Sequence, residues 1–320
     1  HGKRRMKVLF VSSGRAGDVG HVVKNQGESL KKVGTEVEYL TIKPGIIGYL
    51  KAVGRIRGAC RRNSYDLVHA HYSLSAFSAT LAGVRPLVVS VMGSDAYASW
   101  PFRVIIRMLS VCRWDATIVK TEQMKGILKL KKAVVIPNGV DTERFAPSDM
   151  AEARQKLNLP ADRQLVLFIG AADRPEKNLK AAEQAVAELR DSSVLFIHLA
   201  NIPNSDVPHY LNAADLLLLT SLREGSVNVI KEAMACNCPI VSTDVGDVKW
   251  VTGNTEGCFI TSFSIDNIMR TIRMALNFGR RTNGRGKIHS LDLDSLVVSE
   301  KILSLYRGVL TKSTSDGNID

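Results

Sequence analysis

The sequence has no apolar run approaching the roughly 18 residues that a membrane-spanning helix needs. Its first residues, HGKRRMKVLFVSSG, lead into a strand-like segment, without the features of a signal peptide. We therefore expect a cytoplasmic protein, whose association with a membrane would be peripheral, on the inner face. Repeats of fixed period and low-complexity tracts are also missing, which argues against a solenoid and against a long disordered region.

Cysteine is scarce and poorly arranged for cross-linking or metal binding. The five cysteines are an odd number, and none belongs to a CxxC pair. Cys236 and Cys238 lie one residue apart, but no second pair or nearby histidine completes a zinc site. The interpretation is that these are buried, reduced thiols.

Two phosphate-related motifs are absent. The glycines at positions 14, 17 and 20 do not form the GxGxxG pattern of a dinucleotide-binding loop, so a nicotinamide cofactor has little support. No DxD metal motif occurs in a suitable loop, so we expect neither a metal nor another cofactor.

Acidic residues are scarce only in the first half of the chain. Residues 1–157 hold 26 Lys and Arg against 12 Asp and Glu, a net charge of +14, whereas the whole chain has +12. This asymmetry indicates that the first half faces something anionic.

What is present is an alternation of short apolar strands with helical stretches, typical of doubly wound α/β domains. A chain of 320 residues exceeds one comfortable core, which predicts two such domains. We place the first at 1–157 and the second at 158–293. A helix is expected over 294–310, followed by a disordered tail at 311–320.

The stretch from Ala214 to Asp247 is the most informative. It reads as a buried strand, a polar loop, a helix and a second strand. In a parallel sheet such a loop lies at the carboxyl ends of the strands, where open α/β folds bind ligands. The N–H groups of Gly225, Ser226 and Val227 would face an anion there, helped by the helix dipole. The pattern predicts a phosphate site.

Glu224 and Glu232 flank this helix start. At about 1.5 Å rise per helical residue, their carboxylates would lie on the order of 10 Å apart along the axis. They cannot share a proton, but they can accept hydrogen bonds from hydroxyls at two ends of a nucleotide sugar. Two glutamates at this spacing are, on most helices, only solvated surface residues, and the flanking strands and glycines favour the functional interpretation.

The run Glu224-Gly-Ser-Val-Asn-Val-Ile-Lys-Glu232, with the following Ala-Met-Ala and Pro-Ile-Val, resembles the E-x7-E region of retaining glycosyltransferase family 4, which has the GT-B fold. Residues 136–145 (IPNGVDTERF) are similar to the family's domain-end signature. The resemblance covers about 7–310. It implies an α/β protein of two Rossmann-like domains with the active site in a cleft between them, and a C-terminal helix that crosses back to the first domain.

The resemblance also implies roles for single residues. Glu224 would contact the donor sugar, Glu232 the ribose, and the 225–227 amides the phosphates between them. In the loop after Gly170, Lys177 matches the family lysine that neutralises the donor diphosphate, whereas Ala171 replaces the expected arginine. Arg174 lies in the same loop and can reach the phosphates instead, because a guanidinium binds two phosphate oxygens at once.

The acceptor side is less well defined. The family resemblance places Gly17 and Gly20 at the mouth of the cleft; a structural turn without a ligand is the alternative. Met92 replaces the histidine that usually ends a family strand, which leaves the amides of Gly93 and Ser94 as candidate ligands. His71 is a candidate cleft residue, with a structural histidine as the alternative.

The expected activity is transfer of a sugar, with retained anomeric configuration, from a nucleotide-diphosphate sugar to a hydroxyl of a glycan, lipid-linked or small-molecule acceptor, in polysaccharide or glycan biosynthesis. Two rivals remain open: a GT-B nucleotide-sugar epimerase or hydrolase, and a non-catalytic nucleotide-sugar or membrane-binding module. The basic, amphipathic segment 45–60 either lies on an anionic membrane or packs as an ordinary helix. Nucleic-acid binding is not expected, since an aromatic-rich binding motif is missing.

Overall fold

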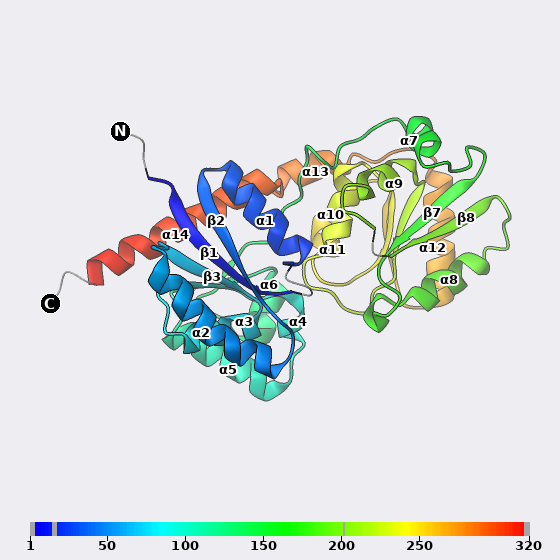
Figure 1. Cartoon of the computed structure of the whole chain (residues 1–320). Helices are drawn as coiled ribbons and strands as arrows, with labels where there is room; N and C mark the ends of the chain where they lie inside the picture. The colour runs from blue at the N-terminus through cyan, green and yellow to red at the C-terminus, as the bar shows by residue number, and fades with distance from the viewer. Residues whose placement is uncertain (1–3, 15–17, 201, 317–320) are drawn as a thin grey trace. The chain divides into compact units, whose positions relative to one another are not determined.

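Two parallel β-sheets organise the chain (Figure 1). The structure is a computed structural model that describes residues 4–14, 18–200 and 202–316. The chain divides into one unit made of 1–139 with 295–320 and another made of 140–294. Each unit is an α/β layer structure with its own sheet and its own buried core, as the alternation of strands and helices predicts.

The first unit has a six-stranded sheet in the order β2-β1-β3-β4-β5-β6. All of the strand pairs are parallel. The strands are β1 (Met6–Ser13), β2 (Thr35–Ile42), β3 (Leu67–His71), β4 (Leu87–Ser90), β5 (Ala116–Val119) and β6 (Val134–Val135). Strands β3 and β4 are buried along their whole length, because helices cover both faces of a parallel sheet.

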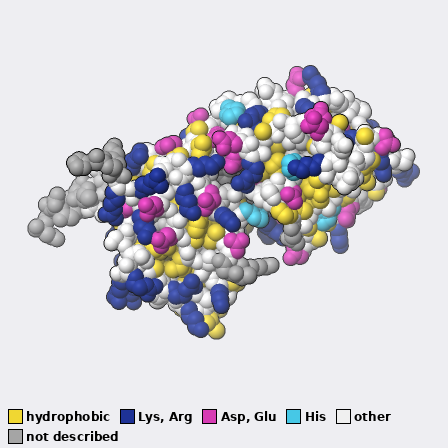
Figure 2. Space-filling view, turned by 45° about the horizontal axis from the view of Figure 1, so that its top comes forward, with side chains coloured by type: hydrophobic (Ala, Val, Ile, Leu, Met, Phe, Trp, Pro, Cys, Tyr) yellow, Lys and Arg dark blue, Asp and Glu magenta, His cyan; other side chains and the backbone are white. Residues whose placement is uncertain are grey.

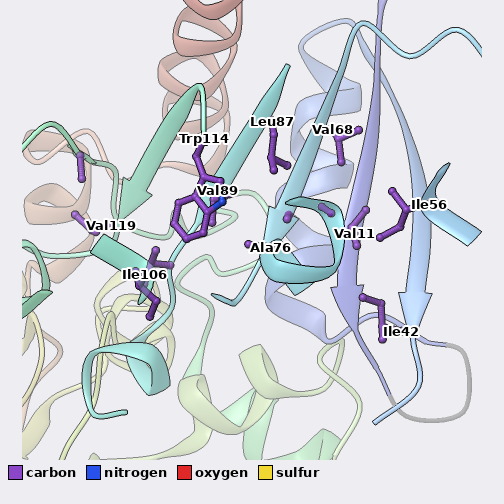
Figure 3. Packing of buried hydrophobic residues seen from close by; sticks show 14 of the residues in the cluster. Val11, Ile42, Ile56, Val68, Ala76, Leu87, Val89, Ile106, Trp114 and Val119 are labelled. Carbon is purple, nitrogen blue, oxygen red and sulfur yellow. The ribbon is translucent and has the colours of Figure 1, made fainter. Parts of the chain in front are cut away.

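Alternate side chains of β1 enter two different cores. Leu9 and Val11 pack in the cluster under helices α2, α3, α5 and α6 (Figure 3), whereas Val8 and Phe10 pack in the cluster under α1 and α14. The helices of this unit are α1 (His21–Lys32), α2 (Ile46–Arg62), α3 (Ser73–Leu81), α4 (Gly93–Ala96), α5 (Trp100–Cys112), α6 (Glu122–Leu128) and α14 (Ser295–Asp316).

The boundary between the units falls at 139/140, earlier than the predicted 157/158. Residues 140–157 belong to the second unit because Val140 and Phe145 are buried in its core. Arg154 also fixes this segment there, since its guanidinium pairs with Asp215 at 2.7 Å. Helix α14 packs on the first unit and continues to Asp316, so the start of the expected tail is helical; 317–320 lie outside the described residues.

The second unit has a five-stranded parallel sheet in the order β11-β10-β9-β7-β8. Its strands are β7 (Gln164–Ile169), β8 (Val194–Leu199), β9 (Leu216–Leu219), β10 (Ile240–Thr243) and β11 (Cys258–Thr261). Its helices are α7 (Met150–Lys156), the 3-10 turn η1 (Pro175–Lys177), α8 (Leu179–Ala187), α9 (Val207–Ala213), α10 (Asn228–Ala235), α11 (Val248–Thr252), α12 (Ile265–Phe278) and α13 (Gly284–Ser290).

The strand order contains a topological switch point. From β7 the chain adds β8 on one side, and it then returns to place β9 on the other side of β7. The connections after β7 and β9 therefore leave the sheet in opposite directions. In open α/β sheets, ligands bind in the crevice outside the carboxyl ends of the strands at such a point.

Candidate active site

Three loops of the second unit meet at the carboxyl edge of its sheet, because they follow the adjacent strands β7, β9 and β10. The loops are tied together by hydrogen bonds. Thr220 Oγ1 donates to the carbonyl of Asn178 at 2.9 Å, and the Leu222 amide donates to the carbonyl of Glu176 at 2.8 Å. Thr243 Oγ1, at the end of β10, donates to the carbonyl of Ser221 at 2.6 Å. The switch point is thus bordered by loops that hydrogen bonds hold together.

Lys177 and Glu224 form an ion pair at this switch point. The Lys177 Nζ donates to Glu224 Oε1 at 2.6 Å, and the two side chains are only 14% and 15% exposed. Ser221 Oγ donates to the same carboxylate oxygen at 2.9 Å. Lys177 ends the turn η1 after β7, whereas Glu224 follows β9. The fold therefore brings together two of the three residues that the sequence suggests for catalysis.

Arg174, the third, does not join them. Its guanidinium is 55% exposed and pairs with Glu176, two residues away, at 2.7 Å. To bind the donor phosphates, the Arg174 side chain would have to break its ion pair with Glu176. That role stays a prediction.

Gly170 directly follows β7 and lies beside Phe168 and the stem of Lys177. Its amide donates a hydrogen bond to the Leu199 carbonyl at 2.9 Å, and its own carbonyl accepts one from His198 Nε2 at 2.7 Å. A Cβ at this position would lie 3.2 Å from the Phe168 ring and 3.5 Å from Lys177 Cγ. A Cβ here would crowd the Phe168 ring, whereas its contact with the stem of Lys177 would be an ordinary one.

The expected set of free amides at 225–227 is not found in full. Helix α10 begins only at Asn228, and the Val227 N–H donates to Asp247 Oδ1 at 2.8 Å. The prediction that this N–H faces a phosphate is therefore wrong. The amides of Gly225 and Ser226 lie in the loop before the helix, and their role toward a donor stays a prediction.

Asp247 forms a buried network that the sequence analysis did not identify. Its Oδ2 accepts hydrogen bonds from Ser226 Oγ at 2.8 Å and from Lys231 Nζ at 2.7 Å. The Lys231 side chain is fully buried and also donates to Ser226 Oγ. Satisfying every member of such a network is what makes a buried charge tolerable. The network fixes the segment between Glu224 and helix α10 against the loop after β10.

Gly246 lies where the loop after β10 meets the loop that carries Glu224. It has φ +58°, and a Cβ would lie 2.1 Å from the carbonyl oxygen of Gly225. Only glycine combines a left-handed backbone with so close an approach. The loop after β10 therefore presses directly on the loop that carries Glu224.

Glu232 lies half-buried on α10. Burial raises the pKa of this carboxyl to about 7, and the neighbouring charges of Arg144 and Lys231 oppose the shift. Near neutral pH the carboxyl is thus divided between its two protonation states. Glu232 lies in the second turn of α10, which begins four residues after Glu224. Its contact with a ribose stays a prediction.

The acceptor roles predicted for glycine and serine residues of the first unit stay predictions. Gly17 lies outside the described residues, and Gly20 is exposed just before α1. Gly93 and Ser94 begin the short helix α4, and their amides stay candidates.

The ring of His71 is fully buried and stacks on His69 with 4.2 Å between centroids. This packing favours the alternative of a structural histidine, and a role in the cleft stays a prediction. Burial, with the charge of Lys120 nearby, holds the His71 pKa well below its usual value, which keeps the ring neutral.

Asp95 is a second residue that the sequence analysis missed. This buried carboxylate accepts from Ser73 Oγ at 2.5 Å, at the start of α3, and from the Met92 amide at 2.8 Å, just before α4. Burial raises the Asp95 pKa, and these hydrogen bonds oppose the shift. An acidic residue three places after Met92 is a capping signal that could have revealed it. Within the described part of the chain, no group of three or more His, Cys, Asp or Glu side chains could hold a metal ion.

Comparison with known families matches almost the whole chain in two parts. Residues 3–144 match "Glycosyltransferase Family 4", and residues 147–277 match "Glycosyl transferases group 1". Among curated proteins, the putative teichuronic acid biosynthesis glycosyltransferase TuaC of Bacillus subtilis is 28% identical over 267 residues, covering 72% of this chain and 67% of TuaC. The D-inositol 3-phosphate glycosyltransferase of Mycobacterium marinum is 25% identical over 295 residues, covering 78% of this chain and 62% of that protein.

Solved structures share the fold. Sucrose-phosphate synthase from Thermosynechococcus elongatus superposes with a TM-score of 0.81 at 20% identity, covering 96% of this chain and 100% of that one. The Anabaena protein Alr3699/HepE, solved in complex with UDP and glucose, superposes with a TM-score of 0.75 at 18% identity, covering 95% and 100%. Together with the two parallel sheets and the family matches over both units, these likenesses establish the assignment. The chain belongs to glycosyltransferase family 4 and has the two Rossmann-like units of the GT-B fold.

Proposed function

We propose that this protein transfers a sugar from a nucleotide-diphosphate sugar to an acceptor hydroxyl with retained anomeric configuration. The observation that carries the proposal is the Lys177–Glu224 pair, 2.6 Å apart at the switch point of the second sheet. A cation and a carboxylate held together at the carboxyl edge of a parallel sheet suit a ligand that has both phosphates and sugar hydroxyls. The binding of UDP and glucose by the Anabaena neighbour supports the same kind of donor.

In the proposed reaction, the bond between the anomeric carbon and the diphosphate oxygen breaks, and the acceptor oxygen bonds to the same face of that carbon. The departing phosphate oxygen takes the acceptor proton, so the products are the glycoside and the nucleoside diphosphate. Lys177 neutralises the negative charge that develops on the diphosphate, which is where a fixed cation lowers the barrier most. Glu224 accepts hydrogen bonds from donor-sugar hydroxyls and orients the ring.

Donor binding changes the partners of both side chains. In the structure, the Glu224 carboxylate receives Lys177 and Ser221. A diphosphate beside Lys177 would compete with Glu224 for the Lys177 ammonium group. Sugar hydroxyls would then donate to Glu224 in place of one of its present donors. The network of Asp247, Ser226 and Lys231 is separate from this exchange and keeps the loop in place while it happens.

Polysaccharide or other glycan assembly is the proposed setting, because the names of the relatives include teichuronic acid biosynthesis. The acceptor would then be a growing glycan or a lipid-linked precursor. Attraction of the basic residues 1–157 to an anionic surface would place the enzyme peripherally at the inner face of the membrane.

A transfer assay with product analysis tests the proposal. We expect sugar to leave the donor only when an acceptor is present, and the new glycosidic bond to keep the donor's anomeric configuration by NMR. Sugar isomerised or released to water without an acceptor would identify an epimerase or a hydrolase. Donor binding without any turnover, across a panel of acceptors, would favour a non-catalytic module.

A further inference from the structure

The outer face of helix α5 is apolar and exposed. Trp100, Val104, Met108 and Val111 recur every three or four residues and are 69%, 44%, 56% and 64% exposed. The inner face of the same helix is already used, because Ile106 is buried in the core under the sheet. A surface helix normally turns polar residues outward, so a second apolar stripe requires a partner.

The neighbouring helices extend this surface. Ile46, Ile47 and Leu50, in the first turns of α2, are 81%, 69% and 62% exposed. Helix α3 adds Leu74 and Leu81, which are also exposed.

Helix α3 joins the other two helices into one layer. Its Ser78 Oγ donates to a carbonyl of α2 at 3.0 Å, and its Phe77 ring packs on Phe102 of α5 with 5.1 Å between centroids. All three helices cover the same face of the first sheet, since all three contribute to one core cluster (Figure 1). We call this layer of α2, α3 and α5 the three-helix face.

The three helices of this face carry cations and no acidic residue. Between positions 43 and 114 the sequence has 10 Lys and Arg against 2 Asp and Glu. Neither acid lies on the three helices: Asp66 accepts the Lys7 amide beside β3, and Asp95 is buried. The cations include Lys51 and Arg55 on α2 and Arg107 on α5, all exposed. Figure 2 shows Lys and Arg side chains numerous over the first unit.

We propose that the three-helix face docks on an anionic lipid bilayer. Helices that carry exposed apolar side chains together with cations, and no acids, complement a surface of anionic headgroups above hydrocarbon. The apolar stripe of α5 would enter the headgroup boundary, with Trp100 at the level typical of interfacial aromatics. No helix in the described part of the chain is long and apolar enough to cross a membrane, so docking is peripheral. The inference deepens the proposed function, on which it rests for the idea of a lipid-linked acceptor, but docking itself requires no transfer activity.

Vesicle sedimentation of the full chain tests the inference. With vesicles of equal parts phosphatidylglycerol and phosphatidylcholine at low salt, we expect the protein to sediment. We expect release by high salt and little binding to pure phosphatidylcholine. The double substitution Trp100→Gln/Met108→Gln should weaken binding to the mixed vesicles by roughly 10-fold or more, because two apolar side chains no longer enter the headgroup boundary.

A matched pair in the second unit provides the control. Trp250 and Met274 are exposed to similar extents, 49% and 58%, and lie outside the three-helix face. Trp250→Gln/Met274→Gln should bind vesicles as the wild type does. Circular dichroism and donor calorimetry would show that both double variants fold and keep their donor site.

Three results would overturn the proposal. The first is a wild type that stays in the supernatant with anionic vesicles at low salt, and the second is equal binding by the two double variants. The third is a wild-type dimer, seen by sedimentation equilibrium, that Trp100→Gln/Met108→Gln converts to a monomer, which would make the face an interface between copies of the chain. None of these results bears on whether a nucleotide sugar binds and reacts, so failure of docking and failure of the proposed activity are distinguishable.

Discussion

Lys177 and Glu224 are separated by 47 residues in sequence, yet their Nζ and Oε1 atoms lie 2.6 Å apart. The pair exists because β7 and β9 are neighbours in the sheet although β8 comes between them in the chain. Each side chain reaches the other from the end of its own strand. The pair therefore marks the point at which the fold, and no local sequence motif, assembles the candidate active site.

Replacing Lys177 should impair the chemical step more than the fold. Lys177→Ala is expected to lower kcat by roughly 100-fold or more, because a preorganised cation is lost where phosphate charge develops. Steady-state transfer kinetics measure this. Lys180→Ala, which removes an exposed lysine three residues away, should leave kcat unchanged. Equal rates for the wild type and Lys177→Ala would remove Lys177 from the mechanism.

The buried ion pair of Lys231 with Asp247 should be costly to break. Lys231→Met leaves Asp247 buried and without its charged partner, for which we expect a loss of about 3–5 kcal/mol in the free energy of unfolding. Urea denaturation measures this loss. Lys249 and Asp244 form the comparison, since they are 77% and 53% exposed and 4.0 Å apart. Lys249→Met should cost less than about 1 kcal/mol, and equal losses for the two variants would contradict the account.

Glu232 should make stability depend on pH in a defined direction. Its pKa is about 7 in the folded protein against 4.5 as its ordinary value, so the folded state holds the proton more tightly. Between these two values the folded state binds more protons than the unfolded state, and stability falls as pH rises. Above about pH 7 the full penalty of the buried carboxylate is present, and below 4.5 it is absent.

Glu232→Gln removes this titration. Relative to wild type, the variant should gain on the order of 1 kcal/mol of stability between pH 5 and pH 8. Thermal or urea unfolding at the two pH values measures the gain. A difference between variant and wild type that does not change with pH would show that the carboxyl titrates normally.

Gly246 should tolerate no side chain. Gly246→Ala would force a Cβ toward the Gly225 carbonyl, 2.1 Å away, from a backbone at φ +58°. We expect a loss of about 1–3 kcal/mol in stability and weaker donor binding, because the Glu224 loop must move. Gly54 on α2 is the matched position, where a Cβ would meet no atom within 4 Å, so Gly54→Ala should stabilise the helix by about 0.5–1 kcal/mol. Differential scanning calorimetry measures the stability of both variants. A Gly246→Ala variant that is as stable as the wild type would refute the close approach.

Local patterns predicted many elements well. The strand, loop, helix and strand predicted over 214–247 are found as β9, the loop before α10, α10 and β10. The two strands are buried apolar runs, a signal that sequence patterns record well. Helix α3 was missed, because its serines and alanines lack a polar face: both sides of the helix are largely buried.

The candidate site was predictable as far as single residues allow. The family resemblance pointed to the loop that carries Glu224 and, separately, to Lys177 in the loop after Gly170. The Asp247 network was not predictable, since Asp247 follows β10 whereas its partners lie just before or on helix α10. For His71 the strand end was identified correctly, but the sequence could not show that its ring would turn inward against His69.

Titration calorimetry with a panel of nucleotide sugars, including UDP and GDP forms, tests the central claim most directly. The wild type should bind one donor, Lys177→Ala should bind that donor more weakly, and Lys180→Ala should bind it as the wild type does. This result would show that the switch point of the second sheet holds the donor diphosphate. Donor binding that is equally strong in all three proteins, or absent from the folded wild type, would contradict the account.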